Sequence, residues 1–222
     1  MANAGRVYLV ASGNDGSLEA MAARALAETG TRAPRVAVSY APIADSPEQL
    51  ASMVPLVGEL FKGAEVMRVA LEGEVGAMNH AAARDVVERA DLVFVVGGDP
   101  VLGVKILGAA RAEVWLRAAR ARGAAMLGVS AGSILLGAWW AAWPDAFAQG
   151  TLVECTRVAG GLVIDCHDEA SDWEELRLVK QMCESKGLAE RARFIGIPTG
   201  GAIVVHSDGS HETVGKPPFH LT

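Results

Sequence analysis

Short apolar runs alternate with longer helix-like segments along residues 6–129, and no other feature of the sequence constrains the fold as strongly. The runs are rich in β-branched residues and predict strands at Arg6–Ala11, Arg35–Tyr40, Glu65–Ala70, Leu92–Val96 and Ala124–Val129. The segments between them predict helices at Ser17–Glu28, Ser46–Phe61, Met78–Arg89 and Val101–Arg122. Near-continuous hydrophobicity is typical of strands covered on both faces. The pattern therefore predicts an α/β fold, a doubly wound, mostly parallel sheet with helices on both faces.

The alternation becomes irregular after residue 143. Beyond that point we expect one helix and three short strands, at Asp172–Lys186, Phe194–Ile197, Ala202–His206 and His211–Val214, the last two strands joined by a turn at residues 207–210. No internal repeat, linker or low-complexity segment interrupts the chain. Hydrophobic residues make up 51% of it, enough for one sizeable core. We therefore expect residues 1–222 to form a single domain.

Composition argues against several classes of function. The formal charge of −6 lacks the basic footprint of a nucleic-acid-binding protein. The cysteines, Cys155, Cys166 and Cys183, show no CxxC spacing, so we expect neither a disulfide framework nor a structural metal site. The apolar run near the N-terminus is too short for a signal peptide or a membrane span. We therefore expect a soluble cytoplasmic protein that binds neither nucleic acid nor membrane.

A serine pentapeptide, Gly128-Val129-Ser130-Ala131-Gly132, connects a predicted strand to the apolar, helix-like stretch Ser133–Trp143. This strand–turn–helix setting is that of a nucleophile elbow, in which the serine hydroxyl is exposed beyond the end of a strand. The N–H of the following residue, here Ala131, forms half of an oxyanion hole. The alternative interpretation is a serine N-cap on a buried helix.

A second glycine-rich turn, Gly97-Gly98-Asp99, also lies between a predicted strand and a predicted helix. The carboxyl ends of parallel strands meet at one edge of a sheet, where ligands bind, so this turn could supply the second oxyanion donor. It has neither the lysine of a phosphate-binding loop nor the glycine spacing of a dinucleotide site. The alternative interpretation is an ordinary tight turn with Asp99 as a helix N-cap.

Four segments occur in an order and spacing that is more specific than any one of them: VVGGDP, GVSAGSILL, VIDCHDE and GIPTGGAIVV. Together they resemble the peptidase E and cyanophycinase family of serine peptidases, from the first strand to about residue 206. The resemblance implies a class I glutamine amidotransferase-like α/β fold. It also implies a serine peptidase that acts on small peptides through an acyl-enzyme and requires no cofactor.

The resemblance also implies roles for individual residues. It makes Ser130 the nucleophile, His167 the base and Asp145 the acid, and it places the oxyanion donors in the Gly97–Asp99 turn and at Ala131. In a triad of this kind, the imidazole takes the serine proton and the carboxylate orients the imidazole.

The residues themselves leave alternatives for the base and the acid. Of the five histidines, only His167 directly follows an apolar strand among several carboxylates. His206 is the second candidate for the base, and His167 could instead be a surface histidine paired with Asp165 or Asp168. Glu169 is the alternative acid, because it stands two residues after His167. Glu154, in the loop before His167, is also available.

The sequence departs from the family where substrate would bind. The family carries two arginines, three residues apart, early in the helix after the histidine; here Arg177 is the second, and Glu174 replaces the first. Thr199 replaces an acidic residue that could bind a substrate amine. With Gly97, these residues are the candidate substrate contacts, and the changes argue against a preference for acidic substrates or cyanophycin.

The expected activity is hydrolysis of small peptides or amides, and two alternatives stay open. One is an esterase or amidase that acts on a non-peptide substrate with the same triad. The other is a catalytically silent binding module of the same fold. The apolar surplus and the resemblance suggest a homodimer, and we expect the tryptophans Trp139, Trp140, Trp143 and Trp173 to lie in the core or at a dimer interface.

Overall fold

A mostly parallel sheet lies at the centre of the protein. The structure is a computed structural model that describes residues 4–71, 80–142 and 150–222. The seven strands run in the order β11-β10-β1-β5-β4-β2-β3. Five of them are parallel: β1 (Val7–Val10), β2 (Arg35–Ser39), β3 (Glu65–Val69), β4 (Leu92–Val95) and β5 (Ala125–Val129). The other two are antiparallel to their neighbours: β10 (Gly201–Val205) and β11 (His211–Gly215).

Helices cover both faces of this sheet. One apolar core joins the sheet to α1 (Ser17–Glu28) and α2 (Pro47–Leu60). The other joins it to four helices: α3 (His80–Arg89), α4 (Pro100–Ala109), α5 (Ala112–Arg122) and α6 (Ala131–Leu136). Along β4, Leu92 and Phe94 face the first core while Val93 and Val95 face the second. The doubly wound α/β prediction is therefore confirmed, and its near-continuous apolar strands have the expected cause.

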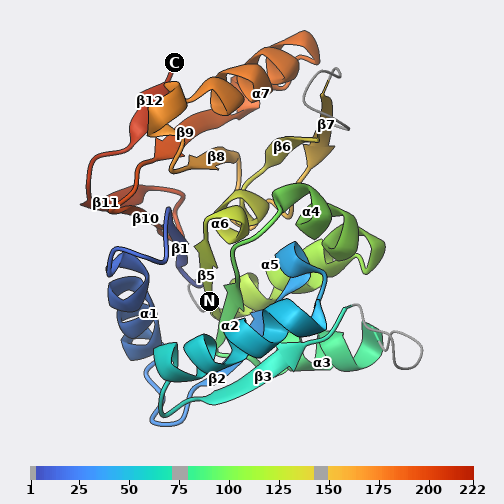
Figure 1. Cartoon of the computed structure of the whole chain (residues 1–222), viewed down its shortest axis with the longest axis vertical. Coiled ribbons are helices and arrows are strands. Elements are labelled where there is room, and N and C mark those ends of the chain that lie inside the picture. The colour runs from blue at the N-terminus through green and yellow to red at the C-terminus, as the bar shows by residue number, and fades with distance from the viewer. Residues whose placement is uncertain (1–3, 72–79, 143–149) are drawn as a thin grey trace.

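Two smaller sheets and one helix lie beside the central sheet, in the upper part of Figure 1. One sheet has the order β12 (Phe219–Leu221), β9 (Arg193–Ile197) and β8 (Leu162–Cys166). The other is the hairpin of β6 (Trp139–Ala142) and β7 (Thr151–Glu154). The helix is α7 (Glu174–Ser185), and single helical turns occur at η1 (Ala41–Ile43), η2 (Glu169–Ser171) and η3 (Ala189–Arg191). No helix in the described ranges is long and apolar enough to cross a bilayer.

Two predicted helices were wrong in extent. The stretch Val101–Arg122 forms two helices, because Arg111 adopts a left-handed conformation (φ 53°) that ends one helix and begins the next. The stretch Ser133–Trp143 is helical only to Leu136. The next residue, Gly137, is extended, and the Ala138 N–H already donates to the Leu162 carbonyl of β8 at 2.7 Å. The chain therefore leaves the helix to pair as a strand.

Three of the four tryptophans expected in the core or at an interface are buried, although none of these three lies within a helix. Trp139 and Trp140 lie on β6 and Trp173 precedes α7; they are 5%, 2% and 5% exposed. Trp143 lies outside the described residues. The Trp173 ring packs so closely on β9 that a Cβ at Gly196 would lie 2.3 Å from it. These aromatic rings therefore fill the core between α7 and the small sheets.

Candidate active site

Ser130 occupies a strained turn between a strand and a helix. Strand β5 ends at Val129 and α6 begins at Ala131. Ser130 itself has φ 52° and ψ −121°, a backbone conformation that non-glycine residues rarely adopt. Its N–H donates to the carbonyl of Val10, the last residue of β1, at 2.9 Å. Strain of this kind costs about 1–3 kcal/mol and persists only where the surrounding structure fixes it.

The glycines on either side of Ser130 allow the helix to begin directly against the strands. A Cβ at Gly128 would lie 2.6 Å from the backbone of Gly132, and a Cβ at Gly132 would lie 2.0 Å from the Val95 carbonyl oxygen. Both distances are far below van der Waals contact. Any larger residue at either position would push α6 away from the edge of the sheet.

Ser133 holds the same helix from inside the core. Its side chain is completely buried. The hydroxyl oxygen accepts a hydrogen bond from the Val10 N–H at 2.9 Å, and it lies 2.9 Å from the Val10 carbonyl and 2.8 Å from the Gly128 carbonyl, to either of which it can donate its proton. The start of α6 is thus fixed to both β1 and β5, which keeps the Ser130 turn in place.

His167 meets Ser130 from the end of a different sheet. It follows β8, has φ 49°, and donates its backbone N–H to the carbonyl of Ile197, the last residue of β9, at 2.9 Å. Its Nε2 atom lies 2.8 Å from Ser130 Oγ. This distance is within the reach of a base that takes the proton of a serine hydroxyl.

The second glycine turn lies beside Ser130. A Cβ at Gly97 would be 3.4 Å from the Cβ of Ser130. Gly98 has φ 143°, and a Cβ there would lie 2.5 Å from the Pro42 carbonyl, so both the conformation and the space require glycine. The predicted proximity of the two turns at one sheet edge is thus observed.

Asp99 does not fit the predicted role of oxyanion donor. Its N–H already donates to the Pro42 carbonyl at 2.8 Å, and its side chain accepts hydrogen bonds from the N–H groups of Val101 and Leu102. Asp99 is therefore the N-cap of α4, which was the alternative interpretation. Ala131 is different, because the first residue of a helix has no acceptor for its N–H within that helix. The remaining candidate donors are Gly98 and Ala131.

Three carboxyl groups lie near His167. The pKa of Asp165 is raised to about 7, mainly by burial and also by the nearby charges of Asp168 and Glu175, while the N–H groups of Cys166 and Leu176 oppose the rise. Burial, with the charge of Asp168, also raises the pKa of Glu175, while His167 acts in the opposite direction. Among the described residues, no group of His, Cys, Asp and Glu is arranged to hold a metal ion.

The candidate acids are placed differently. Asp145 lies outside the described residues. Glu169 accepts a hydrogen bond at Oε1 from the Thr199 N–H, at 3.2 Å, so this carboxylate connects η2 to the segment after β9. Glu154 pairs with Arg157 at 3.3 Å. Sequence reasoning missed Glu175, whose signal was a carboxylate in the first turn of the helix that follows the histidine.

The second candidate for the base lies at the wrong edge of the sheet. Strand β10 is antiparallel to β1, with Val205 opposite Val7, so His206 lies near the start of β1. Ser130 lies beside Val10 at the other end of the same strand. The prediction that His206 shares an edge with Ser130 was wrong, because it assumed a parallel strand.

The two candidate substrate contacts on α7, Arg177 and Glu174, differ in their surroundings. Arg177 donates to the Asp172 carboxylate at 3.0 Å and lies over the ring of Phe219, 5.2 Å from its centre. Glu174 is exposed and begins α7. The guanidinium that the resemblance would assign to an acidic substrate is therefore already held by a carboxylate.

Solved structures of peptidases have the same fold. A peptidase from an acI-B1 Actinobacterium superposes with a TM-score of 0.66 and 19% sequence identity, over 99% of this chain and 95% of that one. A Listeria monocytogenes EGD-e protein, provisionally named a Peptidase E, gives a TM-score of 0.62 and 13% identity, over 96% of this chain and 100% of that one. No model of a known protein family and no curated protein matches the sequence. The chain therefore has a peptidase E-like fold.

Proposed function

We propose that the protein is a serine-type peptidase that hydrolyses small peptides or amides, with Ser130 as nucleophile and His167 as base. The observation that carries the proposal is the 2.8 Å distance between Ser130 Oγ and His167 Nε2, with the serine in a strained strand–helix turn. The peptidase E-like fold of the chain supports the same class of reaction.

The proposed reaction uses these atoms in sequence. Ser130 Oγ attacks the substrate carbonyl carbon while His167 Nε2 takes its proton. The N–H groups of Gly98 and Ala131 donate to the oxyanion that forms. The tetrahedral intermediate then collapses, the leaving amine takes the proton from His167, and an acyl-enzyme remains on Ser130. Water, deprotonated by His167, attacks the acyl carbon, and His167 then returns the proton to Ser130 Oγ as the acid product leaves.

A carboxylate is expected to orient His167 and stabilise its cation. We assign this role first to Asp145, with Glu169 as the alternative. The bond between Glu169 and the Thr199 N–H supports this order, because it already uses one carboxylate oxygen of Glu169.

The proposed substrates are not acidic peptides. Glu174 stands where the family has its first arginine, and Arg177 is paired with Asp172. A substrate carboxylate near the start of α7 would meet the negative charge of Glu174 in place of an arginine, and like charges repel. We therefore propose neutral or amine-bearing small peptides.

Labelling with a fluorophosphonate probe tests the nucleophile. Folded protein should form one covalent adduct, located at Ser130 by peptide mass spectrometry, and heat-unfolded protein should form none. Ser130→Ala should abolish the adduct, whereas Ser207→Ala, which changes a serine in the β10–β11 turn, should keep it. Absence of an adduct at Ser130 in folded protein would count against the proposal.

A substrate panel separates peptidase activity from the alternatives. Dipeptides, amino-acid amides and activated esters are compared with the wild-type protein and Ser130→Ala. Turnover of esters without any peptide would indicate an esterase or amidase. Binding of small molecules without turnover, unchanged in Ser130→Ala, would indicate a silent binding module.

A further inference from the structure

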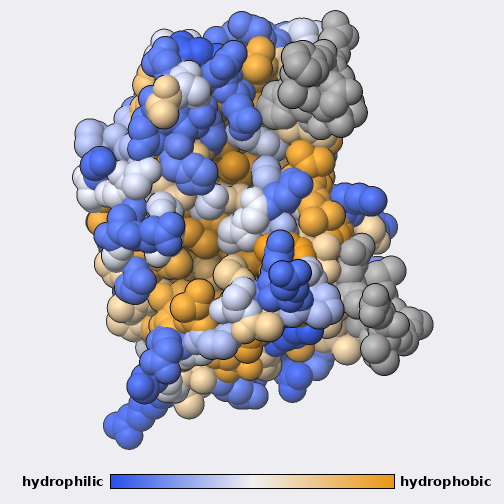
Figure 2. Space-filling model, in the orientation of Figure 1, coloured by the Kyte–Doolittle hydropathy of each residue, from blue (hydrophilic) through white to orange (hydrophobic). Residues whose placement is uncertain are grey.

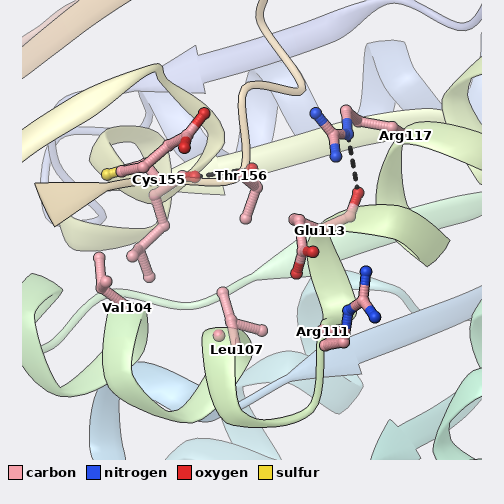
Figure 3. A pocket seen from close by; sticks show the side chains of 10 residues that line it. Val104, Leu107, Arg111, Glu113, Arg117, Cys155 and Thr156 are labelled. Atoms are coloured by element: carbon pink, nitrogen blue, oxygen red, sulfur yellow. Dashed lines mark hydrogen bonds between the residues drawn. The ribbon is translucent and has the colours of Figure 1, made fainter.

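A pocket of about 360 Å³ lies between α4, α5 and the segment that follows β7. Figure 3 shows it from close by, with side chains from both helices on one side and Cys155 and Thr156 on the other. Ser130 and His167 do not line it. The pocket is therefore separate from the candidate active site.

One side of this pocket is apolar. Val104 and Leu107 of α4 lie side by side there, and Leu135 of α6 completes the apolar wall. Leu107 and Leu135 are buried residues of the larger core. Figure 2 shows that hydrophobic residues also gather on the surface over α4. A ligand could therefore bury an aliphatic body against this wall, for which the hydrophobic effect is the driving force.

The part of the pocket lined by α5 is charged. Arg111 and Arg117 project from the start and the second turn of α5, and Glu113 lies between them (Figure 3). Arg117 donates from Nε to the backbone carbonyl of Glu113 at 3.2 Å. Within the described part of the chain, neither guanidinium pairs with a carboxylate. Each can therefore still bind an anion.

The carboxylates of the pocket do not cancel these charges. Glu154 is paired with Arg157 at 3.3 Å. Among the described residues Glu113 has no ion-pair partner, so one carboxylate stands beside two guanidinium groups. The N-terminus of α5 adds a partial positive charge at the same place, because its first N–H groups lack acceptors within the helix. The balance of charge favours an anionic ligand.

We propose that this pocket is a second binding site, for a small carboxylate with a branched aliphatic body. The carboxylate binds to Arg111 and Arg117, which suit the planar, two-oxygen geometry of that group. The aliphatic body lies against Val104, Leu107 and Leu135. An apolar amino acid and a free carboxylic acid share this chemistry, so both are sources of such a ligand. The proposal does not depend on hydrolysis by Ser130.

Three probes of matched shape test the ligand class on the full-length protein, by calorimetry or ligand-observed NMR. They are 4-methylpentanoate, leucine and leucinamide, of which the last lacks a carboxylate. We expect binding of 4-methylpentanoate or leucine, and binding of leucinamide at least about tenfold weaker. Tighter binding of leucine would identify an amino acid as the source, and tighter binding of 4-methylpentanoate a free acid.

Filling the pocket should remove the binding. A Cβ at Gly108, which lines the pocket on α4, meets no atom within 4 Å, so Gly108→Leu adds a side chain in open space. Gly58 of α2 has the same free space, and Gly58→Leu is the matched control. We expect the dissociation constant to rise at least about tenfold in Gly108→Leu and to stay unchanged in Gly58→Leu.

Removal of the guanidiniums is the second measurement. Asn tolerates the left-handed conformation of Arg111 and suits a helix N-cap, so Arg111→Asn should fold. With Arg117→Gln, it should weaken 4-methylpentanoate about tenfold or more while leaving leucinamide unchanged. This pair decides the question if Gly108→Leu does not fold. The proposal is overturned if leucinamide binds as tightly as the carboxylates, if these variants bind like the wild type, or if no probe binds at about 10 mM.

Discussion

Ser130 Oγ lies 2.8 Å from His167 Nε2, although the two residues are 37 positions apart and follow strands of different sheets. Both residues have a positive φ, 52° and 49°. The proposed mechanism requires this proximity, because His167 has to reach the proton of the Ser130 hydroxyl. The candidate site is thus defined by two constrained backbone positions that meet at the edge of the central sheet.

Replacing the candidate base should remove activity without unfolding the protein. His167→Asn keeps a residue that tolerates a positive φ, and it should lower kcat by about a thousandfold or more, because Ser130 loses its proton acceptor. The measurement is steady-state kinetics on the best substrate of the panel. His206→Asn, at the opposite sheet edge, is the control and should keep near wild-type kcat. A His167→Asn variant with wild-type kcat would exclude His167 as the base.

The glycine after Ser130 should be more sensitive than an exposed helical glycine. Gly132→Ala places a Cβ 2.0 Å from the Val95 carbonyl oxygen, so we expect it to lower the free energy of unfolding by about 3 kcal/mol. Gly58→Ala on α2 meets no atom within 4 Å and should raise it by about 0.5–1 kcal/mol. Urea denaturation measures both. Equal effects of the two substitutions would show that the helix start is not tightly packed on β4.

The buried carboxyl of Asp165 should make stability fall as pH rises. Its pKa is about 7 in the folded protein and near 3.8 when exposed, so between these values the folded state retains a proton that the unfolded state has released. Stability therefore decreases by up to about 1.4 kcal/mol per pH unit in that window.

Asp165→Asn removes this proton and should flatten the dependence. Relative to the wild type, the variant should gain about 2 kcal/mol of unfolding free energy between pH 5 and pH 7. Urea denaturation at both pH values measures the difference. Parallel pH curves for variant and wild type would contradict the assignment of a neutral Asp165 carboxyl.

The acid that orients His167 can be identified by comparing three substitutions. Asp145→Asn should lower kcat by about a thousandfold or more, while Glu169→Gln and Glu175→Gln should lower it by about tenfold or less. The pH profile of kcat should change in Asp145→Asn, and Asp145→Glu should restore part of the activity, which a structural role would not predict. If Glu169→Gln is the severe variant, Glu169 is the acid.

The sequence was a good guide to the parallel half of the fold, because the inner strands β1, β5, β4 and β2 are almost entirely apolar and buried. Edge strand β3 is mostly exposed and carries Glu65 and Arg68. It also predicted the meeting of the Ser130 and Gly97 turns, which follows from parallel strand ends. It did not predict the break at Arg111, since an arginine in the left-handed region has no composition signal. It misplaced His206 because strand direction is set by pairing across the sheet rather than by local pattern. The single domain, the homodimer and the cytoplasmic location stay predictions.

The positive φ angles of Ser130 and His167 have an evolutionary consequence. Glycine adopts such conformations at little cost, so Ser130→Gly should relieve strain and yield a more stable protein that has lost its nucleophile. Selection for stability alone would therefore erode this site. A serine at this position therefore trades stability for the chemistry of its hydroxyl, and the melting temperatures of the wild type and Ser130→Gly would measure that trade-off.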